Sequence, residues 1–172
     1  AGAWREGRFN GPCFRKAWGV RTDLRARTFA APLVPMPPPL AALARRLRAL
    51  GERDGVEPLR RFRPNEANAL DYRRARGHRI DAHCDDRQLS GPVLVNVSLA
   101  GDAVMQYAED TRSGASGGAP RRHEVRLRRR SVQVQSGEVR YRFTHAIENR
   151  GLLSERRISI TFRQNAFDGY HC

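Results

Sequence analysis

The sequence predicts a mainly β protein with flanking helices, folded as a double-stranded β-helix, or jelly roll. From about residue 66 onward, short stretches of alternating apolar and polar residues are separated by turn signals, as in antiparallel sandwiches and barrels. A run of leucines at helical spacing precedes these stretches. The length of 172 residues suits one domain with a sizeable core.

The first 60 residues are expected to form an N-terminal extension that packs on a jelly-roll core of residues 61–172, within one structural domain overall. Aromatic residues and arginines mix near the N-terminus with little periodicity, so loops or short strands are expected there. Five prolines between positions 32 and 39 then interrupt regular structure. An amphipathic helix follows, and Gly51 is expected to close it. Its apolar face comprises Leu40, Leu43, Leu47 and Leu50.

The rest of the chain is expected to form strands, because its segments are rich in β-branched residues or alternate between apolar and polar ones. Turns are expected at residues 100–102 and 136–137, and a glycine-rich loop at 113–119. The expected strands are residues 93–99, 103–107, 123–128, 131–135, 139–143 and 157–162.

The chain is strongly basic, with 32 basic and 18 acidic residues and a net charge of +14. Such a charge favours a nucleic-acid partner. An alternative is that the charge reflects genome composition, because every basic residue except Lys16 is an arginine. No apolar run is long enough to span a bilayer, so no membrane partner is expected. The oligomeric state does not follow from the sequence.

Three cysteines are spread widely along the chain, at Cys13, Cys84 and Cys172. Their odd number and the lack of a CxxC pair argue against a disulfide framework and against a structural zinc knuckle. A reducing location, nuclear or cytoplasmic, is therefore expected.

Two histidines and an aspartate form a candidate metal site. His83 and Asp85 stand two positions apart, so in an extended strand their side chains point to the same side. His145 must then come from a different strand, which a sandwich permits. Two imidazoles and one carboxylate suit iron(II) and leave coordination positions open. Zinc with a bound water would use similar ligands, so residue type alone leaves a hydrolase open.

Two arginines flank the last predicted strand. Arg157 and Arg163 are six positions apart, so both project from one face of that strand. Arginines on the inner face of a sandwich carry a desolvation cost unless they meet an anion. They are candidates for holding a dicarboxylic acid beside the metal.

Taken together, these segments resemble the AlkB family of iron(II)- and 2-oxoglutarate-dependent dioxygenases, and within it the branch of homologue four. The resemblance covers roughly residues 60–166. A proline-led leucine helix before the core is also similar to the family's pre-catalytic helix. The motifs that carry the resemblance lie at residues 62–64, 70–72, 80–86, 145–147 and 157–163.

The resemblance implies a role for each matching residue. His83, Asp85 and His145 would bind Fe(II) and form the catalytic centre. The co-substrate 2-oxoglutarate would be held at its distal carboxylate by Arg157, with Tyr72 donating a hydrogen bond. The remaining implied roles are Ser159 beside the co-substrate, Arg163 orienting the metal-side carboxylates or lining the substrate pocket, and Asp86 contacting substrate.

The family pattern is not matched everywhere. Many members place an asparagine two residues before the tyrosine, where this chain has Leu70. Asn68 lies further back, and whether it replaces that asparagine does not follow from the sequence. The co-substrate contact expected from this segment is therefore Tyr72.

The implied activity is oxidative N-demethylation, which yields succinate, carbon dioxide and formaldehyde. Methylated nucleic acid is the favoured substrate, with N6-methyladenine in DNA first, because aromatic residues and arginines near the N-terminus and a second basic stripe suit a base and its phosphates. An equally weighed interpretation places those aromatics in the core. The residues in question are Trp4, Arg8, Phe9, Phe14 and Trp18, and in the stripe Arg121, Arg122, Arg126, Arg128, Arg129 and Arg130.

Two alternatives remain open. One is a protein N-methyl-lysine demethylase of the same family, in which Asp86 with Tyr107 or Tyr141 would surround the methylated cation. The other is a non-catalytic jelly roll that binds nucleic acid independently of metal.

Overall fold

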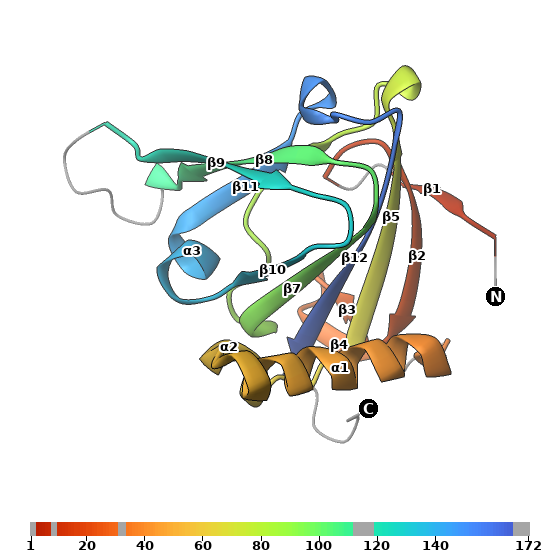
Figure 1. The fold of residues 1–172 in the computed structure, drawn as a ribbon, viewed down its shortest axis with the longest axis vertical. Coiled ribbons are helices and arrows are strands. Elements are labelled where there is room, and N and C mark those ends of the chain that lie inside the picture. Colours follow the sequence, from red (N-terminus) through yellow and green to blue (C-terminus); the bar gives the residue numbers. More distant parts are fainter. Residues whose placement is uncertain (1–2, 8–9, 31–33, 112–118, 167–172) are drawn as a thin grey trace.

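Two antiparallel sheets face each other and a helix covers the outer side of the larger one (Figure 1). The computed structural model describes residues 3–7, 10–30, 34–111 and 119–166. This arrangement confirms the predicted mainly β jelly roll with flanking helices. All strand pairs are antiparallel.

The larger sheet has six strands in the order β1-β2-β5-β12-β7-β10. Its alternating residues point either toward the second sheet or toward the helix layer. The strands are β1 (Arg5–Gly7), β2 (Cys13–Gly19), β5 (Glu66–Arg73), β12 (Arg156–Asn165), β7 (Ser90–Ala100) and β10 (Val132–Gln135).

The smaller sheet has four strands in the order β6-β11-β8-β9, and a two-stranded hairpin stands apart from both sheets. The smaller sheet contains β6 (Ile80–His83), β11 (Phe143–Ile147), β8 (Ala103–Glu109) and β9 (Arg122–Leu127). The hairpin contains β3 (Arg21–Asp23) and β4 (Thr28–Ala30). Single-turn 3₁₀ helices are η1 (Arg74–Arg76) and η3 (Asn149–Gly151).

The N-terminal segment takes part in the larger sheet. β2 pairs with β5 from Phe14 opposite Asp71 to Gly19 opposite Glu66, and β1 pairs with β2. The hydrogen-bonded sheet therefore runs across the expected division at residue 60, which itself stays a prediction.

The described aromatics near the N-terminus pack against the fold. Trp4 and Trp18 lie against the apolar cluster beneath the helix layer, and Lys16 stands over the Trp4 ring at 5.0 Å. Phe14 meets the ring of His78 edge-on at 5.2 Å. These contacts favour the interpretation of the aromatics as core residues. Arg8 and Phe9 lie outside the described residues.

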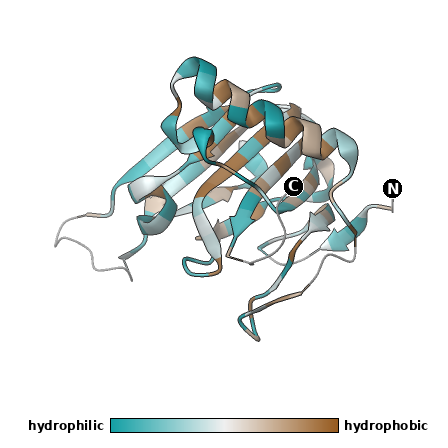
Figure 2. Ribbon diagram, turned by 90° about the horizontal axis from the view of Figure 1, so that it is seen from below, coloured by the Kyte–Doolittle hydropathy of each residue, from teal (hydrophilic) through white to brown (hydrophobic). Residues whose placement is uncertain are grey.

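Helix α1 (Pro38–Asp54) lies across the outer face of the larger sheet. Apolar and polar residues alternate along the helix (Figure 2). Its buried residues Ala44 and Leu47 join a core cluster with side chains of β5, β7 and β12. Among the described helices, none is both long and apolar enough to cross a membrane.

The prediction that Gly51 closes α1 is wrong. The helix continues to Asp54 and ends at Gly55, whose φ of 70° is the left-handed conformation of a C-terminal cap. Gly51 is instead buried, and a Cβ atom there would stand 2.5 Å from the Cβ of Leu59 in α2 (Glu57–Arg60). The glycine thus permits close approach of the two helices.

The prediction of a strand over residues 139–143 is also wrong. Most of this segment forms helix α3 (Gly137–Arg142), and β11 begins at Phe143. Alternation over five residues cannot separate a strand from a short helix when tertiary contacts decide. Here the side chain of Arg140, which alternation would place outward, is 1% exposed. The glycine-rich loop expected at 113–119 lies, except for Ala119, outside the described residues.

Candidate metal and co-substrate site

The three predicted metal ligands meet between the two sheets. His83 ends β6, Asp85 follows it in the next loop, and His145 is the residue of β11 paired directly with His83. One ligand atom from each residue lies within 4.8 Å of the others. The His83 Nε2 to Asp85 Oδ1 distance is 3.7 Å. The set therefore has the donor types and the spacing for one divalent ion such as Fe(II).

The ring of His83 is oriented by a backbone contact. Its Nδ1 lies 2.8 Å from the carbonyl oxygen of Asp81, which leaves Nε2 directed toward the triad. The predicted strand at residues 139–143 would end before His145. In the structure His145 lies within β11, which pairs with both β6 and β8. Tyr107 is the residue of β8 that pairs with His145, and the centroids of their rings are 6.3 Å apart.

Burial and charge keep Asp85 and His145 in the protonation states that bind metal. Burial lowers the pKa of His145 to about 4, so its imidazole is neutral near pH 7. Burial alone would raise the pKa of Asp85, but Arg163 and the two histidines outweigh it and lower that pKa to about 2. A neutral imidazole and an ionised carboxylate are the ligating forms.

Arg163 holds Asp85 in place. Its guanidinium donates to both carboxylate oxygens of Asp85 at 3.1 Å and to Glu66 at 3.2 Å. Although burial opposes it, the two carboxylates raise the pKa of Arg163. Because its guanidinium is bonded to two carboxylates, Arg163 orients the Asp85 side chain.

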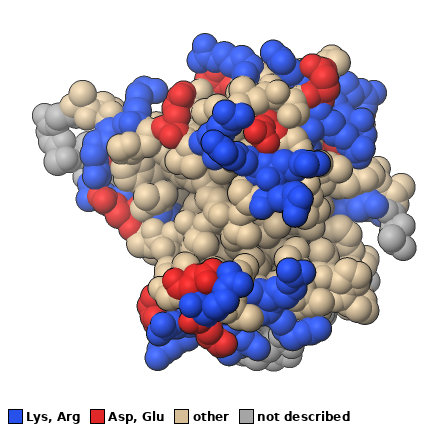
Figure 3. All heavy atoms as spheres, in the orientation of Figure 1, with Lys and Arg blue, Asp and Glu red and all other residues tan. Residues whose placement is uncertain are grey.

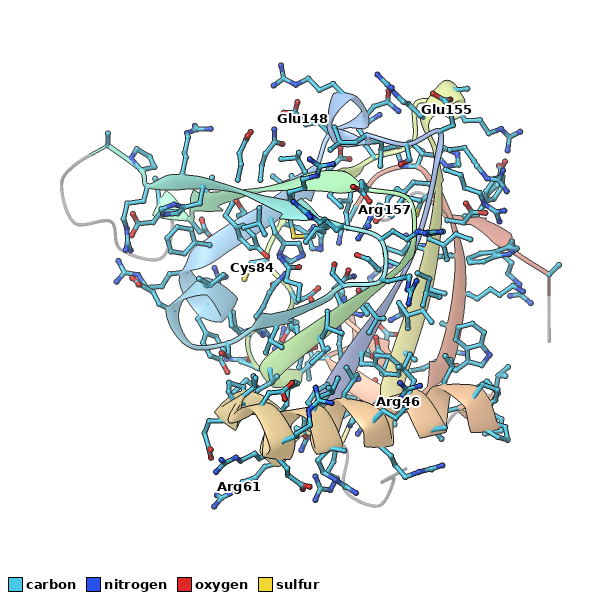
Figure 4. The ribbon with its side chains drawn as sticks, in the orientation of Figure 1. Arg46, Arg61, Cys84, Glu148, Glu155 and Arg157 are labelled. Carbon is cyan, nitrogen blue, oxygen red and sulfur yellow. The ribbon has the colours of Figure 1, made fainter. Side chains whose placement is uncertain are left out.

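Arg157 has different surroundings. It is fully buried, and its guanidinium donates to Ser98 Oγ at 3.0 Å, Asn96 Oδ1 at 3.3 Å and the carbonyl of Gly101 at 3.4 Å. Its Nε has no hydrogen-bond partner in the part of the chain that the structure describes. Figure 4 shows the side chain reaching inward from β12. Among the described residues Arg157 forms no ion pair, and burial lowers its pKa.

A cavity of about 40 Å³ joins the triad to the polar inner face of β12. Ser159 lines it, and so does Tyr72, the residue paired with Arg157 across β5 and β12. Arg157 does not line the cavity itself but contacts Asn96, which does. The polar lining residues are Tyr72, His83, Asp85, Asn96, Gln135, His145, Ser159, Thr161 and Arg163.

The departure from the family pattern has a structural counterpart. Leu70 lines the cavity, at the position where many members carry asparagine. Asn68 donates its side-chain amide to Glu66 instead. Asn68 therefore does not replace the missing asparagine.

Asp86 lies outside this cavity. Its carboxylate accepts hydrogen bonds from the backbone amides of Gln88 and Leu89, at 2.9 and 2.7 Å, and pairs with Arg27 of the β3–β4 hairpin at 3.1 Å. These bonds lower its pKa although burial acts in the opposite direction. Together with Arg27, Cys84 and Asp85, it lines a second, open depression of about 380 Å³.

Cys84, between two ligand positions, faces this depression. Its Sγ donates toward the carbonyl of Arg140 at 3.4 Å. It is not part of the His–Asp–His cluster, as strand alternation predicts.

Two residues near the site were not predicted. Glu66 accepts from Arg163, Thr22 and Asn165, so it connects the metal-side arginine to the hairpin and to the end of β12. Arg140 contacts the loop that carries Asp85. Neither stands in a motif, because their partners are distant in sequence or are backbone atoms.

Basic side chains gather over the α1–α2 layer and over the opposite edge of the molecule (Figure 3). Arg46 and Arg61 are both exposed, and Arg61 extends outward below α2 (Figure 4). In the predicted stripe, Arg121 pairs with Glu109 and Glu138, and Arg126 with Asp102. The stripe residues without an ion pair in the described part of the chain are Arg122, Arg128, Arg129 and Arg130.

Comparisons with known proteins agree with this geometry. The model of the 2OG-Fe(II) oxygenase superfamily matches residues 14–163. The mouse alpha-ketoglutarate-dependent dioxygenase alkB homolog 4 is 31% identical over 137 residues, which cover 66% of this chain and 45% of that protein. A Caenorhabditis elegans DNA N6-methyl adenine demethylase is 28% identical over 122 residues, covering 71% and 39%. The chain spans less than half the length of these curated relatives.

A solved structure, that of OsALKBH1, superposes with a TM-score of 0.62 at 14% identity and covers 94% of this chain and 80% of its own. At this identity the likeness shows the fold. The family match brings with it Fe(II) and 2-oxoglutarate, and the His–Asp–His cluster suits the metal. The chain belongs to the 2OG-Fe(II) oxygenase superfamily and, within it, to the AlkB family, near alkB homolog 4.

Proposed function

We propose that this chain is an Fe(II)- and 2-oxoglutarate-dependent dioxygenase that removes N-methyl groups from nucleic acid, with N6-methyladenine in DNA as the favoured substrate. The observation that carries the proposal is a His–Asp–His cluster sharing one polar cavity with strand β12, on which a buried arginine lacks a carboxylate partner.

His83, Asp85 and His145 would hold the iron. When bound, iron and 2-oxoglutarate would activate O2, the oxidant that hydroxylates an N-methyl carbon while 2-oxoglutarate is converted to succinate and carbon dioxide. Arg163 keeps the Asp85 carboxylate ionised and oriented, because it donates to both of its oxygens. Asp85 and His145 thus need no proton loss before they receive the metal.

The distal carboxylate of 2-oxoglutarate would meet Arg157, with Tyr72 and Ser159 beside it. Among the described residues, the hydrogen-bond partners of the buried guanidinium are all neutral, so an incoming carboxylate would supply the missing negative charge. Burial raises the pKa of Tyr72, so its hydroxyl stays a proton donor. Because the cavity of about 40 Å³ holds only a few water molecules, we expect its lining side chains to move apart when the diacid binds.

The substrate would approach through the open depression beside Asp85. Arg27 and Arg87 stand at its rim, together with Asp86. Both arginines are ion-paired, Arg27 with Asp86 and Arg87 with Asp110, so the depression itself selects neither a phosphate nor a cationic methyl-lysine. Tyr107, one candidate wall for methyl-lysine, is buried between the sheets and bonded to Gln133. The net charge of +14 and the relative named as a DNA N6-methyl adenine demethylase support nucleic acid rather than methyl-lysine as the substrate.

The proposal includes a reducing, nuclear or cytoplasmic location. Cys13 and Cys84, the two cysteines in the described residues, are both free. Free thiols are typical of such compartments.

The test is mass spectrometry of methylated oligonucleotides and methyl-lysine peptides after incubation with Fe(II) and 2-oxoglutarate. We expect succinate formation and demethylation of the N6-methyladenine oligonucleotide. Turnover of peptides alone would replace nucleic acid by protein as substrate. If metal-independent DNA binding occurred without any succinate, the chain would be a non-catalytic binding module.

The metal assignment has its own variants. His83→Ala and Asp85→Ala should abolish succinate formation, because each removes one of three ligands. His123→Ala, which changes an exposed histidine of β9, is the matched control and should keep activity. Normal turnover in the His83 or Asp85 variant would contradict the assignment.

A further inference from the structure

Arg140 is a buried cation whose charge is directed at backbone rather than at a carboxylate. It lies in α3 and is 1% exposed. Its guanidinium donates four hydrogen bonds, each to a main-chain carbonyl. The acceptors are the carbonyls of Asp85 at 3.0 Å, Asp86 at 2.6 Å, Ser90 at 3.2 Å and Gly91 at 3.2 Å.

These four carbonyls belong to one segment, the loop that runs from Asp85 to the start of β7. The loop therefore curves around the guanidinium, and all three guanidinium nitrogens are used. Only the planar fork of arginine offers donors in this spread, since a lysine ammonium is a single point on a flexible stem. The loop begins with the candidate metal ligand Asp85.

Asp85 is therefore held from two directions. Arg163 fixes its carboxylate from β12, while Arg140 fixes its main-chain carbonyl from α3. A carboxylate bound at its oxygens alone could still shift with its backbone. The contact from Arg140 removes that freedom and ties the position of the ligand to α3.

We propose that Arg140 is a positioning residue that sets the place of Asp85 in the metal centre by fixing the path of the loop at residues 85–91. This inference rests on the proposed function, because it treats Asp85 as a ligand. Arg140 contacts neither metal nor substrate in this scheme. It acts through the backbone of the loop.

The experiment compares Arg140→Lys with Arg142→Lys in the full chain. Both changes keep the positive charge and lie in α3, but the Arg142 side chain is 40% exposed and pairs with Glu109 and Glu138. The probe is Co(II), which is titrated in air and without substrate. It reports affinity and, through its visible d–d absorption, the geometry of the ligands.

We expect Arg140→Lys to bind Co(II) about 10- to 100-fold more weakly than the wild type, the range typical when a group that orients a metal ligand is changed. Its d–d spectrum should also shift. Arg142→Lys should match the wild type in both measurements. Melting temperatures measured without metal confirm that each variant is folded during the titration.

The outcomes separate the two proposals. Wild-type affinity and spectrum in Arg140→Lys would overturn the role of Arg140 alone. Failure of the wild type to bind Co(II) would contradict the metal site itself. A second variant, Arg140→Gln, covers the case in which lysine does not fit. Loss of the fold in both variants would make Arg140 a determinant of stability and would overturn the positioning role.

Discussion

Arg157 and Arg163 lie on one face of β12 in opposite electrostatic surroundings. Arg163 stands between two carboxylates, whereas Arg157 is buried among a hydroxyl, an amide and a carbonyl. A buried cation with neutral partners is expensive for the folded state. Stability alone does not explain why a buried arginine is present at position 157, whereas binding of an anionic ligand would explain it.

Replacing Arg157 by Met should therefore separate binding from stability. We expect the dissociation constant for 2-oxoglutarate, measured by calorimetry with Mn(II) present, to rise about 30- to 150-fold, because a charge-assisted pair worth about 2–3 kcal/mol is lost. The free energy of unfolding should change by less than about 1 kcal/mol, since desolvation of the charge is relieved.

Arg156→Met is the control for this prediction. Arg156 is the preceding residue of β12, but it is partly exposed and pairs with Asp71. Its substitution should leave the affinity for 2-oxoglutarate unchanged. Equal weakening by both variants would remove Arg157 from the co-substrate site.

His145 should make the metal-free protein sensitive to acid. Its pKa falls from an ordinary 6.5 to about 4 on folding because of burial. Between these values the unfolded chain binds a proton that the folded state excludes, so stability is lost as pH falls from about 6.5 to 4. The loss from this group is about 3 kcal/mol at most.

Urea unfolding of the metal-free protein at pH 7, 5.5 and 4 measures this effect. His145→Gln should flatten the decline over that window relative to the wild type. The exposed His123→Gln should leave the decline as steep as before. An unchanged pH dependence in His145→Gln would mean that His145 is not the group responsible.

Some residues of the candidate site can be predicted from the sequence, and others cannot. His83 and Asp85 follow from strand alternation, and the cluster they form with His145 is present. Arg140 could not be found in this way, because its partners are carbonyl oxygens that any sequence carries. Glu66 likewise meets Arg163 only because β5 and β12 are adjacent.

At the scale of elements, periodicity predicted the long strands and α1 but failed at short or crowded places. β12 and β7 contain 10 and 11 residues, enough for alternation to be distinctive. α3 has only six residues, too few for alternation to distinguish it from a strand. Gly51 resembles a helix end in the sequence, but it lies within α1 because the contact with α2, which the sequence does not show, requires a glycine there.

Gly51→Ala should consequently destabilise the protein. Alanine normally favours a helix interior by about 1 kcal/mol over glycine. Here its Cβ would stand 2.5 Å from the Cβ of Leu59 and 2.9 Å from the backbone nitrogen of Arg60, so overpacking prevails. We expect a net loss of about 1–3 kcal/mol in urea unfolding. The neighbouring exposed Glu52→Ala should cost less than about 0.5 kcal/mol.

At the scale of the whole molecule, the charge of +14 is unevenly neutralised. Arg74, Arg76 and Arg79 each stand within 4.0 Å of a carboxylate. The turn between β9 and β10 contains Arg128, Arg129 and Arg130, which form no ion pair among the described residues. Arginines whose side chains form no ion pair offer more of their charge to a polyanion than paired ones, so position should matter more than total charge.

This difference predicts the salt dependence of DNA binding. Changing Arg128, Arg129 and Arg130 together to Gln should weaken binding of a single-stranded oligonucleotide and reduce the slope of log Kd against log salt by about 2, if each arginine neutralises one phosphate. The matched triple change of Arg74, Arg76 and Arg79 to Gln removes the same charge from ion-paired positions and should alter the slope by less than about 1. Fluorescence anisotropy between 50 and 200 mM salt measures both, and equal slopes for the two variants would show that net charge alone governs binding.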